Sequence, residues 1–95
     1  MIYELRFSEG ALKQIERHKK AGNKSYLNKL TKLLEIIRVD PFGKNSNVGK
    51  FEVLKGSQGQ MMSRRIDKYN RLVYYVENDI IAVIVVSAAG HYENL

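Results

Sequence analysis

The fold of this chain is decided by residues 71–87, which read RLVYYVENDIIAVIVVS. Two stretches rich in β-branched and aromatic residues, Arg71–Glu77 and Ile80–Ser87, flank Asn78-Asp79, a pair that favours turns. The pattern predicts two antiparallel strands joined by a short turn. Because residues 80–86 are almost wholly apolar, we expect the second strand to be central in a sheet and covered on both faces.

Two further strands are predicted upstream of this pair, at Phe51–Leu54 and Met61–Ile66. The loop KGSQGQ at residues 55–60 separates them, and the polar segment PFGKNSNVGK at residues 41–50 precedes them. A turn at Asp67–Asn70 joins the second of them to the central pair.

Three arginines lie on the strands beside this turn. If the turn is symmetric, Ile66 pairs with Arg71. Strict alternation then places Arg64 near Arg71 on one face of the sheet and Arg65 on the other, unless a bulge shifts the register. Guanidinium groups on a sheet face can hold phosphate oxygens in pairs, but strand arginines also serve simply as solubilising residues, and the sequence leaves both interpretations open.

The N-terminal half predicts one strand and two helices. Residues 2–7 alternate in strand fashion, and Ser8 is a favourable N-cap for a helix that ends at Ala21-Gly22. Asn23 caps a second helix, which ends at Asp40-Pro41 because the residue before proline avoids the helical region. The order β-α-α-β-β-β-β predicts an α+β fold, with two antiparallel helices packed on one face of a twisted, mainly antiparallel sheet of four to five strands.

Composition narrows the class of protein. The 95 residues fit one domain, and the absence of cysteine excludes disulfides, thiolate catalysis and zinc fingers. The formal net charge of +6 indicates an anionic partner, either nucleic acid or an acidic protein. Most of the excess lies in residues 1–47, with ten basic and five acidic side chains. With no signal peptide and no long apolar run, we expect a cytoplasmic protein without a membrane partner.

Two side chains of the second half could transfer protons. Glu52 lies between Phe51 and Val53, and desolvation there would raise the pKa of its carboxyl group and suit it to act as a general base. An edge-strand glutamate in water is the other interpretation, and the sequence favours it. His91 directly follows the predicted central strand, which would position it, but the residues alone favour a role for it without chemistry. His18, at the polar end of the first helix, is expected to be a solvated surface residue.

A carboxylate, a histidine and arginines, without a cluster of metal ligands, are suited to metal-free cleavage of RNA. A base removes the proton of a 2′-OH, the alkoxide attacks the adjacent phosphate, and an acid protonates the leaving 5′-oxygen. Each of these residue types is common, so a second class of function stays open. It is a non-catalytic basic module that binds nucleic acid or a partner protein, with Arg64, Arg65 and Arg71 on phosphate.

Beyond these patterns, the chain resembles the YoeB/Txe branch of the RelE-type toxins over essentially its whole length. The segments that carry the resemblance are Pro41-Phe42-Gly43, Phe51-Glu52-Val53-Leu54-Lys55, Ser63-Arg64-Arg65-Ile66, Arg71-Leu72-Val73-Tyr74 and His91-Tyr92. The resemblance implies the toxin of a type II toxin–antitoxin system, with a small RNase-like α+β fold and a ribosome-dependent endonuclease activity on mRNA.

The same resemblance implies the roles of individual residues. Glu52 corresponds to the family's catalytic carboxylate and proposed general base, and Arg71 to the arginine that stabilises the scissile phosphate. His91 corresponds to the general acid, and Tyr92 to the aromatic residue that orients the substrate base.

Further binding residues and partners follow from the resemblance in the same way. Lys55 and Arg65 correspond to basic positions near the transferred phosphate, and we add Arg64 to them as an RNA-binding candidate. The implied partners are an acidic antitoxin of the YefM/Axe kind, the ribosome with its mRNA, and a second copy in a homodimer. DNA is contacted only through the antitoxin, and no metal or other cofactor is expected.

Overall fold

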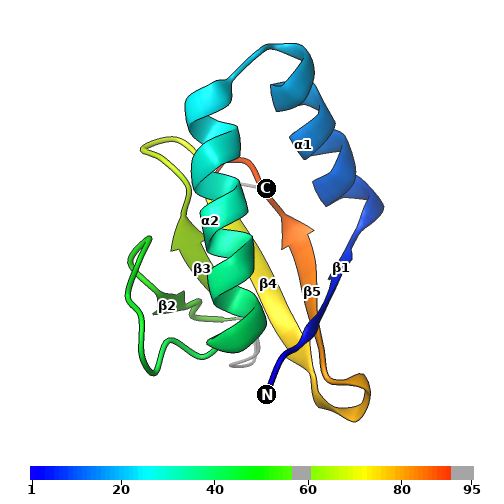
Figure 1. The fold of residues 1–95 in the computed structure, drawn as a ribbon, viewed down its shortest axis with the longest axis vertical. Helices are drawn as coiled ribbons and strands as arrows, with labels where there is room; N and C mark the ends of the chain where they lie inside the picture. The colour runs from blue at the N-terminus through cyan, green and yellow to red at the C-terminus, as the bar shows by residue number, and fades with distance from the viewer. Residues whose placement is uncertain (57–60, 91–95) are drawn as a thin grey trace.

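The computed structural model describes residues 1–56 and 61–90; residues 57–60 and 91–95 lie outside the described part. The elements follow in the predicted order (Figure 1). They are β1 (Glu4–Phe7), α1 (Glu9–Lys20), α2 (Lys24–Val39), β2 (Glu52–Val53), β3 (Met62–Arg65), β4 (Arg71–Glu77), a 3₁₀ turn (Asn78–Ile80) and β5 (Ala82–Ser87).

The strands form one five-stranded sheet in the order β1-β5-β4-β3-β2. The β5–β4, β4–β3 and β3–β2 pairs are antiparallel, whereas β1 pairs with β5 in parallel. The last strand therefore pairs with the first strand, which forms one edge of the sheet. β5 lies in the interior of the sheet, as its apolar sequence predicts. The predicted α+β fold class is confirmed, with a mixed sheet.

Both helices begin and end at the predicted signals. The Ser8 side chain accepts a hydrogen bond from the Ala11 amide at 3.0 Å and so caps α1. The Asn23 side chain accepts one from the Tyr26 amide at 3.3 Å and caps α2, which ends before Asp40-Pro41. Within the residues that the structure describes, neither helix has the length and apolar content needed to cross a bilayer.

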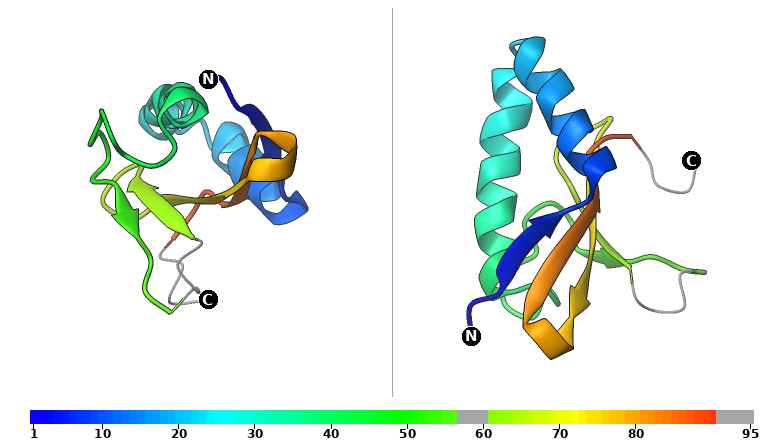
Figure 2. Two further views of the ribbon diagram at one scale, coloured as in Figure 1. Left: turned by 90° about the horizontal axis from the view of Figure 1, so that it is seen from below. Right: turned by 90° about the vertical axis from the view of Figure 1, so that its right-hand side faces the viewer.

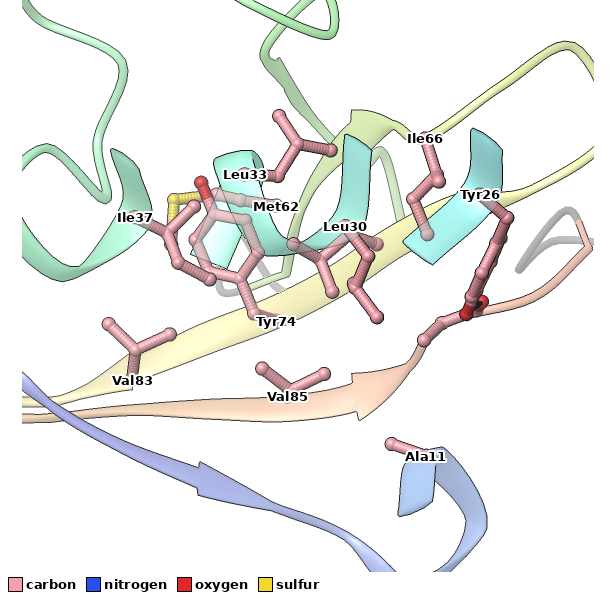
Figure 3. Packing of buried hydrophobic residues seen from close by; sticks show 12 residues of the cluster. Ala11, Tyr26, Leu30, Leu33, Ile37, Met62, Ile66, Tyr74, Val83 and Val85 are labelled. Carbon is pink, nitrogen blue, oxygen red and sulfur yellow. Dashed lines mark hydrogen bonds between the residues drawn. The ribbon is translucent and has the colours of Figure 1, made fainter. Parts of the chain in front are cut away.

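The core lies between α2 and one face of the sheet (Figure 2). Four residues at helical spacing on α2 are buried: Tyr26, Leu30, Leu33 and Ile37. They pack against side chains of β3, β4 and β5, and Ala11 joins them from α1 (Figure 3). Each buried Leu or Ile of this kind contributes about 1.5–3 kcal/mol relative to an exposed one, so this layer anchors the sheet to the helices.

The last strand departs from expectation at its start and on one of its faces. Ile80 and Ile81 belong to the turn and are 46% and 42% exposed, so β5 begins at Ala82, two residues later than predicted. The chain reverses through Ile81 with φ +50°, a value that does not continue a strand. Side chains on the helix side of β5 are fully buried, but Ile84 and Val86 on the opposite face are only half-buried. Ala82 on that same face is buried, so the expectation that both faces are covered is met only in part.

Candidate active site on the sheet face away from the helices

The register of β3 on β4 decides which arginines share a face. Arg65 pairs with Arg71 and Arg64 pairs with Leu72, one residue away from the predicted register. Opposite residues of an antiparallel pair point to the same face, so Arg65 and Arg71 lie together on the face away from the helices. Arg64 points to the core face, and the prediction that it shares a face with Arg71 is wrong.

The turn between the two strands explains the shift. The Asn70 carbonyl accepts hydrogen bonds from the amides of both Ile66 and Asp67, at 2.9 and 3.2 Å. The Asp67 carboxylate in turn accepts the amides of Tyr69 and Asn70. These bonds close an asymmetric turn, and the pairing moves by one residue relative to a symmetric one.

Arg64 is a buried structural residue and does not lie on the sheet face that carries Arg65 and Arg71. Its side chain is 0% exposed, and its guanidinium donates to the carbonyl oxygens of Val48 at 2.9 Å and Asp40 at 3.1 Å. A third contact joins its Nε to the hydroxyl of Tyr74 at 3.4 Å. Arg64 thus fastens the loop of residues 41–50 to β3, and this enclosure leaves its guanidinium no access to a phosphate in solution.

Asp40 organises the other end of the same loop. Its carboxylate accepts three backbone N–H groups, those of Lys44, Asn45 and Ser46, at 2.8–3.0 Å. Burial acts to raise the pKa of Asp40, but these hydrogen bonds and the charge of Arg64 outweigh it and hold the pKa below its ordinary value. The carboxylate is therefore ionised at neutral pH, and it compensates the charge of the buried arginine.

Gly49 brings the loop against the strand. Its carbonyl accepts the Arg65 amide at 2.5 Å, and its φ of +78° lies in the left-handed region. A Cβ at this position would lie 2.8 Å from the Arg65 carbonyl oxygen, so a side chain would collide with the backbone of β3. This close approach places the loop beside β3, so the chain that follows Gly49 forms β2 next to β3, and Glu52 pairs with Ser63.

Glu52 and Arg71 meet on the face of the sheet that points away from the helices. Glu52 lies opposite Ser63, which lies opposite Val73, so Arg71 reaches diagonally across β3. Its Nη1 lies 3.2 Å from Glu52 Oε1. Two residues separated by 18 others in the chain are thus in contact, which the sequence alone does not indicate.

The two partners differ in their environments. The Glu52 side chain is 57% exposed, whereas that of Arg71 is 11% exposed. The interpretation of Glu52 as an edge-strand carboxylate in water is the right one, and the idea of a desolvated carboxylate is wrong, because β2 is a short edge strand of two residues. The Nε of Arg71 is buried and has no hydrogen-bond partner among the described residues. A buried donor without a partner favours binding of an anion that would accept from it.

The remaining basic candidates lie at the solvent-exposed rim. Arg65 and Lys55 are exposed, and Arg65 lies directly opposite Arg71. In the described part of the chain, no three His, Asp or Glu side chains lie close enough together to hold a metal ion.

His91 and Tyr92 lie outside the described residues, but the residue before them is well anchored. The Gly90 carbonyl accepts the Arg71 amide at 3.2 Å, and the Gly90 amide donates to the Asn70 side chain at 3.1 Å. The backbone that leads into His91 is therefore bonded to the backbone of Arg71. Sequence reasoning assigned Asn70 only to a turn and missed this contact, because nothing local connects residues 70 and 90.

His18 also differs from its expected environment. Its ring stacks on that of Tyr26, with centroids 3.7 Å apart and an interplanar angle of 13°. Its Nδ1 lies 3.1 Å from the Asn23 side-chain nitrogen, so His18 is half-buried and the prediction of a solvated residue is wrong. The Tyr26 hydroxyl donates to the Ala88 carbonyl, and burial together with the charge of Asp67 raises the pKa of Tyr26 to about 12.

Comparison with known proteins identifies the family. Residues 7–92 match the family described as the YoeB-like toxin of bacterial type II toxin–antitoxin systems. The chain belongs to the YoeB toxin family. This confirms the resemblance found in the sequence, and the chain is therefore the toxin of a type II toxin–antitoxin system.

Individual members of the YoeB family agree in sequence and in structure. Toxin YoeB of Mycobacterium bovis is 38% identical over 72 residues, which cover 76% of this chain and 79% of that protein. The YoeB dimer from Staphylococcus aureus is similar in structure with a TM-score of 0.79 and 29% identity, covering 97% of this chain and all of that one. YoeB in the YoeB–YefM complex from the same organism gives a TM-score of 0.74 and 30% identity, with the same coverage.

Proposed function

We propose that this YoeB-family toxin is an endoribonuclease that cleaves mRNA on the ribosome and so inhibits translation. The observation that carries the proposal is the contact between Glu52 and Arg71 on the face of the sheet away from the helices, at 3.2 Å. A solvent-accessible carboxylate beside a largely buried guanidinium, whose Nε has no partner among the described residues, combines a proton acceptor with an anion-binding group.

The proposed reaction is the transfer of the phosphate to the neighbouring 2′-oxygen. Glu52 accepts the proton of the 2′-OH, and the 2′-oxygen forms a bond to phosphorus as the bond to the 5′-oxygen breaks. Arg71 donates to the phosphate oxygens, on which negative charge increases in the transition state. His91 gives its proton to the departing 5′-oxygen, so the products are a 2′,3′-cyclic phosphate and a 5′-hydroxyl. No step in this scheme uses a metal ion.

The other basic residues of the face are assigned to binding. Arg65 is opposite Arg71 and exposed, which suits it to contact a neighbouring phosphate of the same strand. Lys55 is proposed as a second phosphate contact and Tyr92 as the aromatic residue that orients a base. Arg64 is left out of this set because its guanidinium is enclosed by loop carbonyls.

We also propose that the toxin binds an acidic antitoxin of the YefM kind in the cytoplasm and can form a homodimer. A YoeB of similar structure forms a complex with YefM, and another was solved as a dimer. The net charge of +6, concentrated on the helical half, favours an acidic protein partner.

Mapping of 5′ ends on mRNA in programmed ribosomes tests the proposed cleavage. We expect new 5′ ends with the wild-type protein and a loss of at least about 100-fold in rate for Glu52→Gln, Arg71→Ala and His91→Ala, because each removes one element of acid–base or charge stabilisation. Glu4→Gln and Arg6→Ala are matched controls, since this exposed pair lies on the far edge strand. Ribosome or RNA binding without new 5′ ends would instead favour a non-catalytic basic module, and full activity of all three variants would refute the proposed site.

A further inference from the structure

The turn between β3 and β4 contains a side-chain clamp on the end of the chain. Asn70 uses both ends of its amide: its nitrogen donates to the Asp67 carboxylate at 3.0 and 3.2 Å, and its oxygen accepts the Gly90 amide at 3.1 Å. Only this orientation of the amide gives each atom a complementary partner, because a carboxylate accepts and an N–H donates. Asp67 therefore fixes which way Asn70 points.

Asp67 is itself held firmly. Its Oδ1 accepts the backbone amides of Tyr69 and Asn70 at 2.9 and 2.8 Å. Burial acts to raise the pKa of Asp67, but these hydrogen bonds and the charge of His18 outweigh it and keep the pKa below its ordinary value. The clamp therefore rests on an ionised carboxylate at neutral pH.

Gly90, the residue that Asn70 holds, directly precedes the two proposed site residues His91 and Tyr92. Gly90 has φ +62°, a conformation that glycine adopts readily. Because glycine is also free to adopt other conformations, further contacts are needed to hold it there. Two hydrogen bonds fix it, one to the Asn70 side chain and one from the Arg71 amide at 3.2 Å. Asn70 and Arg71 are neighbours in the chain, so the clamp ties the point of departure of residues 91–95 to the arginine that contacts Glu52.

We propose that Asn70 is a positioning residue of the active site. By holding Gly90 against the backbone of Arg71, it fixes the point from which the chain continues into His91 and Tyr92, relative to Arg71 and Glu52. Because a misplacement of about 1 Å can lower the rate of a reaction by about 100-fold, the clamp affects turnover more than binding. This inference rests on the proposed nuclease function.

An exchange of the two clamp residues gives a sharp test. Asn70→Asp is nearly isosteric, but it places a second carboxylate against Asp67, and like charges at hydrogen-bond distance repel. The double variant Asp67→Asn/Asn70→Asp restores the pair with its polarity reversed: the new amide at 67 donates, and the new carboxylate at 70 still accepts from Gly90. Asn78→Asp is the matched control, since it makes the same chemical and charge change in the exposed turn between β4 and β5.

The readouts are the kcat and KM of cleavage on programmed ribosomes and hydrogen exchange at the Gly90 amide. We expect Asn70→Asp to lower kcat by about 10- to 100-fold with little change in KM, and to speed exchange at Gly90. The double variant should restore both towards wild type, and Asn78→Asp should alter neither. Rescue is the decisive result, because it shows that the loss comes from the broken pair between residues 67 and 70 and not from the added charge alone.

Two outcomes would overturn the inference, and each differs from failure of the proposed function. A folded Asn70→Asp variant with wild-type kcat and wild-type exchange at Gly90 would show that the clamp does not operate. A double variant as slow as Asn70→Asp, although Gly90 is protected again, would show that the clamp does not position the site. If the wild-type protein itself produces no new 5′ ends, the nuclease proposal fails, and the role of Asn70 in catalysis fails with it.

Discussion

Substitution of Arg64 by methionine tests whether this buried arginine fastens the loop of residues 41–50 to the sheet. Arg64→Met keeps a long side chain but removes the donors to the carbonyls of Val48 and Asp40. It also leaves the Asp40 carboxylate, 3.8 Å from the guanidinium, without its opposite charge. Each buried carbonyl that loses its partner costs about 1–3 kcal/mol, and removal of one member of a buried ion pair costs about 3–5 kcal/mol.

The expected loss in the free energy of unfolding is about 4 kcal/mol, from the lower bounds of about 1 kcal/mol for the Val48 carbonyl and about 3 kcal/mol for the ion pair. The lower bounds apply because the Asp40 carboxylate keeps its three backbone N–H partners and the Asp40 carbonyl still accepts the Gly43 amide. Urea unfolding followed by circular dichroism measures it, with Arg64→Lys as a milder variant in case Arg64→Met does not fold. Arg65→Met is the matched control on the same strand; its side chain is exposed, so we expect a change below about 0.5 kcal/mol. Equal losses for Arg64→Met and Arg65→Met would refute the structural role assigned to Arg64.

Three further predictions concern the loop, the acid limb of stability and the first helix. Gly49→Ala should lower the free energy of unfolding by about 1–3 kcal/mol more than Gly22→Ala, since both have positive φ but only a Cβ at Gly49 meets backbone; similar losses in urea unfolding would contradict the close approach. The pKa of Asp40 is lower in the folded chain than its ordinary value, so its stabilising contribution is present above that value and is lost as the pH falls through the folded pKa. Stability measured from pH about 5 downwards should therefore fall more steeply in the wild type than in Asp40→Asn, and parallel curves would count against this. Ser8→Ala should cost about 1 kcal/mol through loss of the α1 cap, and an unchanged urea midpoint would show that the cap contributes nothing.

The helices were predictable because their signals are local. Ser8 and Asn23 cap the residues that follow them, and Asp40-Pro41 ends α2 through a clash between neighbours in the chain. The buried side chains of α2 recur at helical spacing, so the face that packs on the sheet could also be recognised. Each of these signals acts within about one helical turn, which is why sequence reasoning found them.

The strand register was harder to predict from the sequence than the helices. The asymmetric turn at Asp67–Asn70 depends on one carbonyl that accepts two amides, and that choice reversed the faces of Arg64 and Arg65. Side chains alternate between the two faces of a sheet, so an error of one residue in the register assigns every side chain of the strand to the wrong face. The hydrogen bond between the Asn70 side chain and the Gly90 amide could not be predicted either, since 19 residues separate the two partners along the chain.

The sequence by itself determined the element order, the helix boundaries, the YoeB family and the list of candidate groups, because these depend on residue type and on neighbours in the chain. Only the tertiary structure decided that Glu52 contacts Arg71 and that Arg65 shares a face of the sheet with Arg71. It also decided that Arg64 is buried between β3 and the loop of residues 41–50. The physical reason is that burial and ion pairing depend on where the chain returns to itself. The contact between β2 and β4 across β3 depends on the bend at Gly49, which its hydrogen bond with the distant Arg65 amide sets, and on the strand register that the turn at Asn70 sets.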